Sequence, residues 1–202
     1  MNAAGADRLA PVLLTVDPGA PIAGSWVGGA MPECLLSPER GGAFDRHLHL
    51  LTLSAHLPAM AAGPALTILL REGFAVYQPD TEYPDIGVAC VVHEVSPPDP
   101  AGTGRTLGMD TGALVAIPAG DPDVPYLVKV GGTPDLIQDP PPAARRLAGD
   151  GFRFLLQVDD NGFPDGFVTG DYPFGFGALY VFARAGDGGG IADVVAGFTQ
   201  FS

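Results

Sequence analysis

The sequence predicts a single β-rich α+β domain over residues 1–202, built from two related small-sheet lobes that pack together. Three observations carry this prediction. Short apolar runs separated by turn residues recur along the whole chain, with 29 Gly and 21 Pro spread among them. Helical periodicity is scarce. Three landmarks of the first half also recur, in the same order, in the second half.

Apolar runs of strand length, bounded by turn residues, give most of the expected elements. We expect strands or short apolar runs of strand type at residues 13–16, 47–57, 66–70, 88–95, 113–117, 126–130, 152–158 and 177–184. Residues 191–201 are expected to form a closing strand or a short helix. Residues 142–147, PAARRL, are the best candidate for a helix, because helix formers follow a proline-rich entry.

The three recurring landmarks are a glycine pair before a proline, a strand around Leu-Leu, and a strand that leads to Arg and Gly at fixed offsets. They occupy residues 27–32 and 130–134, 47–53 and 152–158, and 65–73 and 178–186. Chance similarity is the alternative, because glycine and leucine pairs are frequent in this composition. Duplication predicts lobes at about 11–95 and 105–202, joined by the linker-like loop 96–104, with the shared core between them.

Charge limits the classes of partner. The formal net charge is −13, and Lys129 is the only lysine. Such a chain repels nucleic acid and anionic membranes and is steered toward a basic protein. The simpler interpretation is that the acidity only keeps the protein soluble.

The cysteines and the N-terminus predict a cytoplasmic protein. Two cysteines, Cys34 and Cys90, are too few for a disulfide scaffold, and no CxxC pair is present for zinc. Cys90 lies in an apolar run and is expected to be a buried thiol. We find no signal-peptide pattern and no apolar run of about 20 residues, so no membrane partner is expected.

Motifs in the second half resemble the YwqG family. They are VKVGGTP at 128–134 followed by Gln138-Asp139, LLQVD at 155–159, Gly170-Asp171, and LYVF at 179–182. The family shows a GG-x-P-x-x-x-Q element, an LLQ-hydrophobic-D strand, a G-D turn and a terminal LYFFI-like strand, and its members look internally duplicated. The resemblance covers about residues 22–184 and is more specific in 128–184 than in 22–73.

Two departures separate this chain from the family pattern. The usual tryptophan-rich segment before the G-D turn is replaced by residues 163–167, FPDGF, and the first half lacks the glutamine after its proline. The resemblance therefore implies a fold more strongly than a reaction. Bacterial relatives lie near polymorphic toxin genes, so the resemblance also implies, by association, a toxin-immunity role.

Histidines give the first candidate site. His47 and His49 lie two residues apart and share one face if they are on a strand. With His56 or His93 they would supply metal ligands. No HExxH motif is present, and no carboxylate lies at a spacing from these histidines that is typical of a metal site. We therefore interpret the pair as a half-exposed structural pair and predict no metal and no cofactor.

The acidic turn Asp159-Asp160-Asn161-Gly162 resembles the start of a calcium loop. The glutamate required at the twelfth position is replaced by Gly170. Asn-Gly is a strong hairpin signal, so a turn is the preferred interpretation. The Asp after LLQ recurs in the family, so the resemblance implies a structural Asp159 that ties down backbone amides of a neighbouring loop. No GxSxG motif, Walker lysine or base near either cysteine in sequence is present, so no catalytic set is predicted.

Three further polar residues stand next to apolar strands at positions that match the family pattern: Gln138, Gln157 and Asp171. The structural interpretation is that they satisfy backbone groups at strand ends, and the functional one is contact with a ligand.

Two functions from different classes follow. The first is a non-enzymatic module that binds a basic protein, as an immunity protein caps a nuclease toxin. It requires a clustered acidic face, with candidates Asp80, Glu82, Asp85, Asp121, Asp123, Asp159, Asp160 and Asp165. The second is a small-ligand-binding protein or enzyme that uses the cleft between the lobes, with Gln138, Gln157, Asp171, His47 and His49 at its wall. A third reading is that the partner is a second copy of the chain.

Overall fold

The computed structural model describes residues 11–40, 42–58, 64–102, 106–118, 125–186 and 190–201. The helices of these ranges are α1 (Pro142–Gly149) and the short 3-10 helices η1 (Glu33–Leu35), η2 (Pro38–Arg40) and η3 (Asp160–Gly162). The strands are β1 (Val12–Asp17), β2 (Trp26–Val27), β3 (His47–Leu53), β4 (Ala65–Arg71), β5 (Val88–His93), β6 (Gly112–Ala116), β7 (Val128–Val130), β8 (Arg153–Asp159), β9 (Ala178–Ala185) and β10 (Ile191–Gln200).

The β-rich prediction is confirmed, and the expected strands and the helix lie close to their predicted positions. The expected strand 47–57 ends at Leu53, and the closing segment is the strand β10. The helix continues two residues past its predicted end, to Gly149. The two-residue strand β2 was not expected, since two residues carry no periodic signal.

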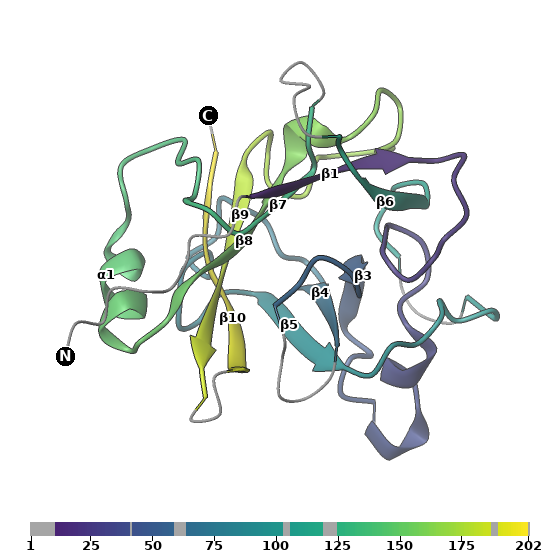
Figure 1. Cartoon of the computed structure of the whole chain (residues 1–202), viewed down its shortest axis with the longest axis horizontal. Helices are drawn as coiled ribbons and strands as arrows, with labels where there is room; N and C mark the ends of the chain where they lie inside the picture. Colours follow the sequence, from purple (N-terminus) through teal and green to yellow (C-terminus); the bar gives the residue numbers. More distant parts are fainter. Residues whose placement is uncertain are drawn as a thin grey trace.

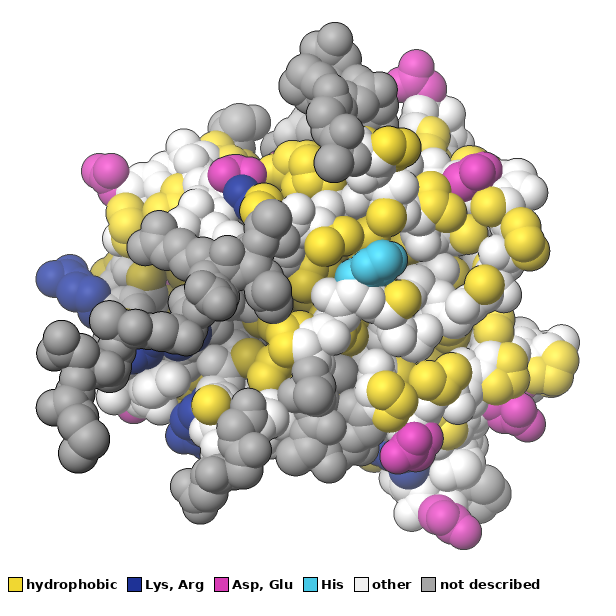
Figure 2. Space-filling model, viewed as in Figure 1, with side chains coloured by type: hydrophobic (Ala, Val, Ile, Leu, Met, Phe, Trp, Pro, Cys, Tyr) yellow, Lys and Arg dark blue, Asp and Glu magenta, His cyan; other side chains and the backbone are white. Residues whose placement is uncertain are grey.

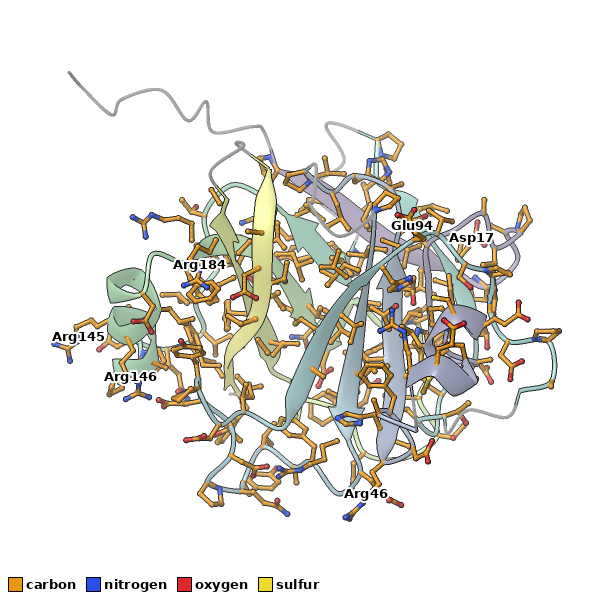
Figure 3. All side chains as sticks on the ribbon, turned by 90° about the horizontal axis from the view of Figure 1, so that it is seen from below. Asp17, Arg46, Glu94, Arg145, Arg146 and Arg184 are labelled. Atoms are coloured by element: carbon orange, nitrogen blue, oxygen red, sulfur yellow. The ribbon has the colours of Figure 1, made fainter. Side chains whose placement is uncertain are left out.

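All ten strands of the described ranges lie in one antiparallel sheet, in the order β10-β9-β8-β7-β1-β6-β2-β3-β4-β5. The two end strands, β5 and β10, lie side by side in Figures 1 and 3, so the sheet is rolled and nearly closed. Residues 81–83 pair with the edge of β10: Tyr83 N donates to Gly197 O over 2.6 Å, and Thr199 N donates to Thr81 O over 3.2 Å. This pairing satisfies backbone groups that an open edge would expose.

The strand order is symmetric about the central pair β1–β6. β7 to β10 follow in sequence order on one side, and β2 to β5 on the other. β1 pairs with β7, and β6 pairs with β2, so each half lends its first strand to the other half. The expected pair of separate small sheets is therefore one continuous sheet, because the exchanged strands join the halves.

Local features also recur at corresponding places in the two halves. The pairing of β3 with β4 shifts register between His49 and Leu51, and that of β8 with β9 shifts between Phe154 and Leu156. Gly28 N donates to the carbonyl of the skipped Leu50, and Gly131 N to that of Leu155, both over 2.8 Å. Both glycine pairs, 28–29 and 131–132, have φ between 62° and 77°. A bulge and a left-handed glycine pair thus define the same corner twice.

Apolar side chains fill the interior and part of the outside of the rolled sheet. The largest buried cluster combines inward-facing Val, Leu, Ile and Phe side chains from strands of both halves. Outside the sheet, Ala143 and Leu147 of α1 pack against Tyr180, Phe182 and Phe198 of β9 and β10. Met31 and Leu35, at η1, pack against Leu69 of β4. Each half therefore has a short helical segment over the outer face of its later strands.

Candidate functional site

Buried polar side chains in the second half hold the loop that follows the glycine pair 131–132. Gln157, fully buried on β8, accepts a hydrogen bond from Asp135 N over 2.9 Å. Tyr180 Oη donates to Asp135 O over 2.8 Å. Gln200 accepts from Ile137 N over 2.9 Å and from Gln138 N over 3.2 Å. The buried amide side chains of Gln157 and Gln200 thus satisfy backbone groups of one loop, which for Gln157 is the structural interpretation of its place beside an apolar strand.

The side-chain amide of Gln138 lies on the same loop but is exposed, and it donates to Phe201 O over 2.8 Å. The buried amide of Gln200 also donates to Gln138 O over 3.1 Å and to Asp139 O over 3.2 Å. Gln138 and Gln157 are therefore brought to one loop, and Gln200, which sequence reasoning did not single out, links that loop to β10.

The substitution Gln200→Leu is expected to lower the free energy of unfolding by about 2 kcal/mol, because loop N–H groups lose a buried acceptor. The exposed Gln138→Leu is the matched control and is expected to cost less than about 1 kcal/mol. Urea unfolding of both variants measures the difference. Equal losses would show that the buried amide has no special role in holding the loop.

In the first half, a row of hydrogen-bonded polar side chains in the interior contains two histidines, His49 and His93. His49, expected to be half-exposed, is fully buried, and the Trp26 ring packs against it with ring centroids 5.6 Å apart. Its Nδ1 lies 3.0 Å from Gly28 O, and its Nε2 lies 3.0 Å from Thr52 Oγ1. Burial lowers the pKa of His49 to about 4. The row continues from Thr52 Oγ1 to Thr67 Oγ1 over 2.8 Å.

The row ends at a second buried histidine and a cysteine. His93 Nε2 lies 2.8 Å from Thr67 Oγ1, and its Nδ1 lies 2.7 Å from Glu94 O. The thiol of Cys34, at η1, lies 3.4 Å from the same Nδ1. Cys34 N donates to Ser96 Oγ over 3.1 Å, which fixes the cysteine beside the histidine. This pair was missed because 59 residues separate its members in the sequence.

His47 lies apart from this row. Its half-buried ring packs edge-on against Phe44 with centroids 5.8 Å apart. Burial, and then the nearby Arg71 guanidinium, lower the pKa of His47. His56 is exposed, at a positive φ of 64°. Within the described ranges, no three His, Cys, Asp or Glu side chains gather closely enough to hold a metal ion.

A pocket of about 340 Å³ opens at one end of the rolled sheet, between residues 70–77 of the first half and residues 171–176 of the second half; Leu107 also lines it. Aromatic rings dominate the pocket: Tyr172 and Phe176 lie with centroids 4.5 Å apart, and Phe74 packs edge-on against Phe174. Asp171, singled out from the sequence, is exposed and lines the same pocket.

The rim of this pocket exposes two large aromatic side chains. Tyr77 is 82% exposed and Phe176 is 57% exposed. Phe176 also has a positive φ of 61°, which costs a bulky residue about 1–2 kcal/mol. Exposed aromatic rings, one of them on a strained backbone, are typical of surfaces that bind a partner or ligand. The sequence did not predict this exposed aromatic rim, because isolated aromatic residues in loops form no pattern.

The buried carboxyl of Asp160 holds the segment 171–176, which supplies one wall of the pocket. Asp160 is 1% exposed, and its Oδ2 accepts a hydrogen bond from Phe174 N over 2.7 Å. Burial raises the pKa of Asp160 to about 7, against the opposing effect of backbone N–H groups at Phe174, Phe176 and Gly177. Tying down a neighbouring loop was expected of Asp159. The half-buried Asp159 instead accepts from Asn161 N within its own turn, over 3.0 Å, and from the Gln157 side-chain amide over 3.4 Å.

The acidic side chains proposed to bind a basic partner do not gather into one acidic face among the described residues. Asp80 pairs with Arg71, Glu82 pairs with Arg146 over 3.3 Å, and Asp160 is buried. Asp121 and Asp123 lie outside the described residues. On the face of the molecule seen in Figure 2, the Asp and Glu side chains form separate spots. Most of the Lys and Arg side chains on this face lie toward the side of α1. The rim of the pocket is therefore a more specific candidate than a broad acidic face.

The residues singled out from the sequence thus lie in separate places. Gln138 and Gln157 lie at the loop after the second glycine pair, His49 in the buried row, His47 beside Arg71, Asp159 in its own turn, Asp171 at the aromatic pocket, and Asp160 bonded to the segment that lines this pocket. None of the helices in the described ranges is long and apolar enough to cross a membrane. No protein-family model, curated protein or solved structure matches the chain.

Proposed function

We propose that this protein is a non-enzymatic, cytoplasmic binding module that recognises a basic protein, and that the aromatic pocket receives an Arg or Lys side chain of this partner. The observation that carries the proposal is the exposure of Tyr77 and Phe176, 82% and 57%, at the rim of a pocket that also holds Asp171. Aromatic residues are enriched at protein interfaces and bind cations through their ring faces.

Charge favours a cationic occupant. The chain carries a formal net charge of −13, so a basic protein is attracted at long range. At the pocket, the apolar stem of an Arg or Lys side chain would lie on the rings of Tyr172 and Phe176, and its charged end would meet Asp171. One pocket then supplies both burial of apolar surface and specificity for positive charge.

We further propose that the chain consists of two related halves and belongs with the YwqG family, whose gene neighbourhoods make a basic toxin the leading class of partner. The symmetric strand order, the paired bulges and the paired left-handed glycines support the relation between the halves. The motifs quoted above support the family. The pocket would then lie where segments of the two halves meet.

Two short peptides test the proposal. One has a central Arg between Leu residues, and the other has neutral citrulline in place of this Arg. The Arg peptide is expected to bind at least about tenfold more tightly, and raising salt from roughly 0.05 M to 0.3 M should weaken it. Tyr77→Ser and Asp171→Asn should each reduce its affinity about tenfold. Fluorescence anisotropy of labelled peptides measures these affinities.

Asp165→Asn is the matched control, because Asp165 is exposed and not among the residues that line the pocket. It removes the same charge as Asp171→Asn and is expected to change the affinity less than about twofold. Equal losses in the two variants, or equal binding of Arg and citrulline peptides, would contradict the proposal.

A second candidate function is small-ligand binding in the same pocket. It is favoured by the pocket's volume of about 340 Å³ and by its lining from both halves. Neutral aromatic compounds that bind the wild type, lose affinity in Tyr77→Ser and keep it in Asp171→Asn would favour this candidate over the basic partner.

A further inference from the structure

The contact of Cys34 with His93 places a nucleophile beside a base, away from the aromatic pocket. The thiol is partly exposed and lies 3.4 Å from His93 Nδ1. On the far side of the ring, Thr67 Oγ1 lies 2.8 Å from Nε2 and fixes the orientation of the imidazole. A nucleophile, a base and a group that orients the base form the arrangement that activates thiols in proteins.

Counting hydrogens shows what this row of side chains lacks. Between Gly28 O and Glu94 O, the row makes five polar contacts through His49, Thr52, Thr67 and His93. Two neutral imidazoles and two hydroxyls supply only four hydrogens. Whichever tautomers are chosen, one contact therefore brings two acceptors together without a hydrogen.

The Cys34 thiol is the nearest source of the missing hydrogen. If its proton passes to His93, every contact of the row contains one hydrogen, and the Nδ1 hydrogen faces both Glu94 O and the sulfur. Burial lowers the pKa of His93, which opposes a lone imidazolium. A thiolate 3.4 Å away compensates, because the pair has no net charge.

We infer that Cys34 is a nucleophilic thiol activated by His93 and is a site of covalent modification by soft carbon electrophiles. With a haloacetamide, a sulfur electron pair forms the S–C bond while the carbon–halogen bond breaks and halide leaves with its electron pair. The thiol proton, held on His93 during attack, is then released to water. Sulfur thus exchanges its proton for an alkyl group and carbon exchanges halide for sulfur, so no oxidant is needed.

The charged groups that act on His93 among the described residues lie at the surface. Arg40 of η2 disfavours a charged His93, and the Glu94 carboxylate favours it. Both side chains belong to exposed residues. Inside, Thr67 leads through Thr52 to His49, and Ser96 Oγ accepts from Cys34 N. Figure 3 shows Arg145, Arg146 and Arg184 on the α1 side, away from Glu94.

Alkylation by iodoacetamide, mapped to each cysteine by mass spectrometry, tests the inference. At about pH 7, Cys34 is expected to react at least about tenfold faster in the wild type than in His93→Gln. Lowering the pH from about 8 to about 6.5 should slow the wild type less than about threefold, whereas His93→Gln should slow about thirtyfold, as an unassisted thiol does.

Thr67→Val separates activation from mere packing, since it preserves shape and removes the hydroxyl that orients His93. Its alkylation rate should fall about threefold to fivefold, and its pH profile should move toward that of His93→Gln. Cys90, which is half-buried and not fully buried as expected, is the internal control, because desolvation and then the Asp193 carboxylate raise the pKa of its thiol to about 12. Equal rates and parallel pH profiles in the wild type and His93→Gln would overturn the inference.

Discussion

Replacing Gly28 with alanine is expected to lower the free energy of unfolding by about 4 kcal/mol or more, enough to leave much of the protein unfolded. Gly28 has φ +67°, which costs an L-residue about 1–2 kcal/mol. Its Cβ would also overlap the Asp110 carbonyl oxygen and lie 3.0 Å from Met109 Cγ. That carbonyl belongs to the backbone and cannot move aside without disturbing the β2–β6 pairing.

Gly73→Ala is the matched control for this substitution. Gly73 has a similar φ of +81°, and a Cβ added there would meet nothing within 4 Å. It therefore carries the conformational cost alone, about 1 kcal/mol. Urea unfolding of the two variants separates strain from steric overlap. A Gly28→Ala protein as stable as Gly73→Ala would mean that the chain does not approach so closely at this corner.

The elements were largely predictable, and their assembly was not. Apolar runs such as 66–70 and 152–158 indicated β4 and β8, because a buried strand needs only a local pattern. The exchange of β1 and β6 between halves depends on which edges meet in space, and an apolar run does not encode its partner. The sequence therefore predicted two small sheets where one rolled sheet forms.

For the candidate sites too, features encoded locally in the sequence were predictable, and contacts between distant segments were not. Gln157 was identified from its place beside an apolar strand, and it is a buried polar anchor. Cys34 and His93 are brought together by the folding of η1 over the outer face of β4 and β5, which no local spacing records. Likewise, the aromatic pocket arises because two loops distant in the chain end at one side of the sheet.

The largest pH effect on stability is expected from Asp160. Its pKa is about 7 in the folded protein and about 3.9 in an unfolded chain. Between these values the folded state keeps a proton that the unfolded state has lost, so stability falls as pH rises. A difference of about 3 pKa units corresponds to about 4 kcal/mol, fully present below pH 4 and lost as the pH passes 7.

The substitution Asp160→Asn isolates this effect, because asparagine offers Phe174 N an acceptor and does not titrate in this range. Urea unfolding from about pH 5 to pH 8 should show the wild type losing about 3 kcal/mol relative to Asp160→Asn. Asp165→Asn, in an exposed position, controls for the loss of one negative charge. A constant difference between the wild type and Asp160→Asn would mean that the backbone N–H groups around Phe174 hold the carboxylate charged, and that burial does not dominate.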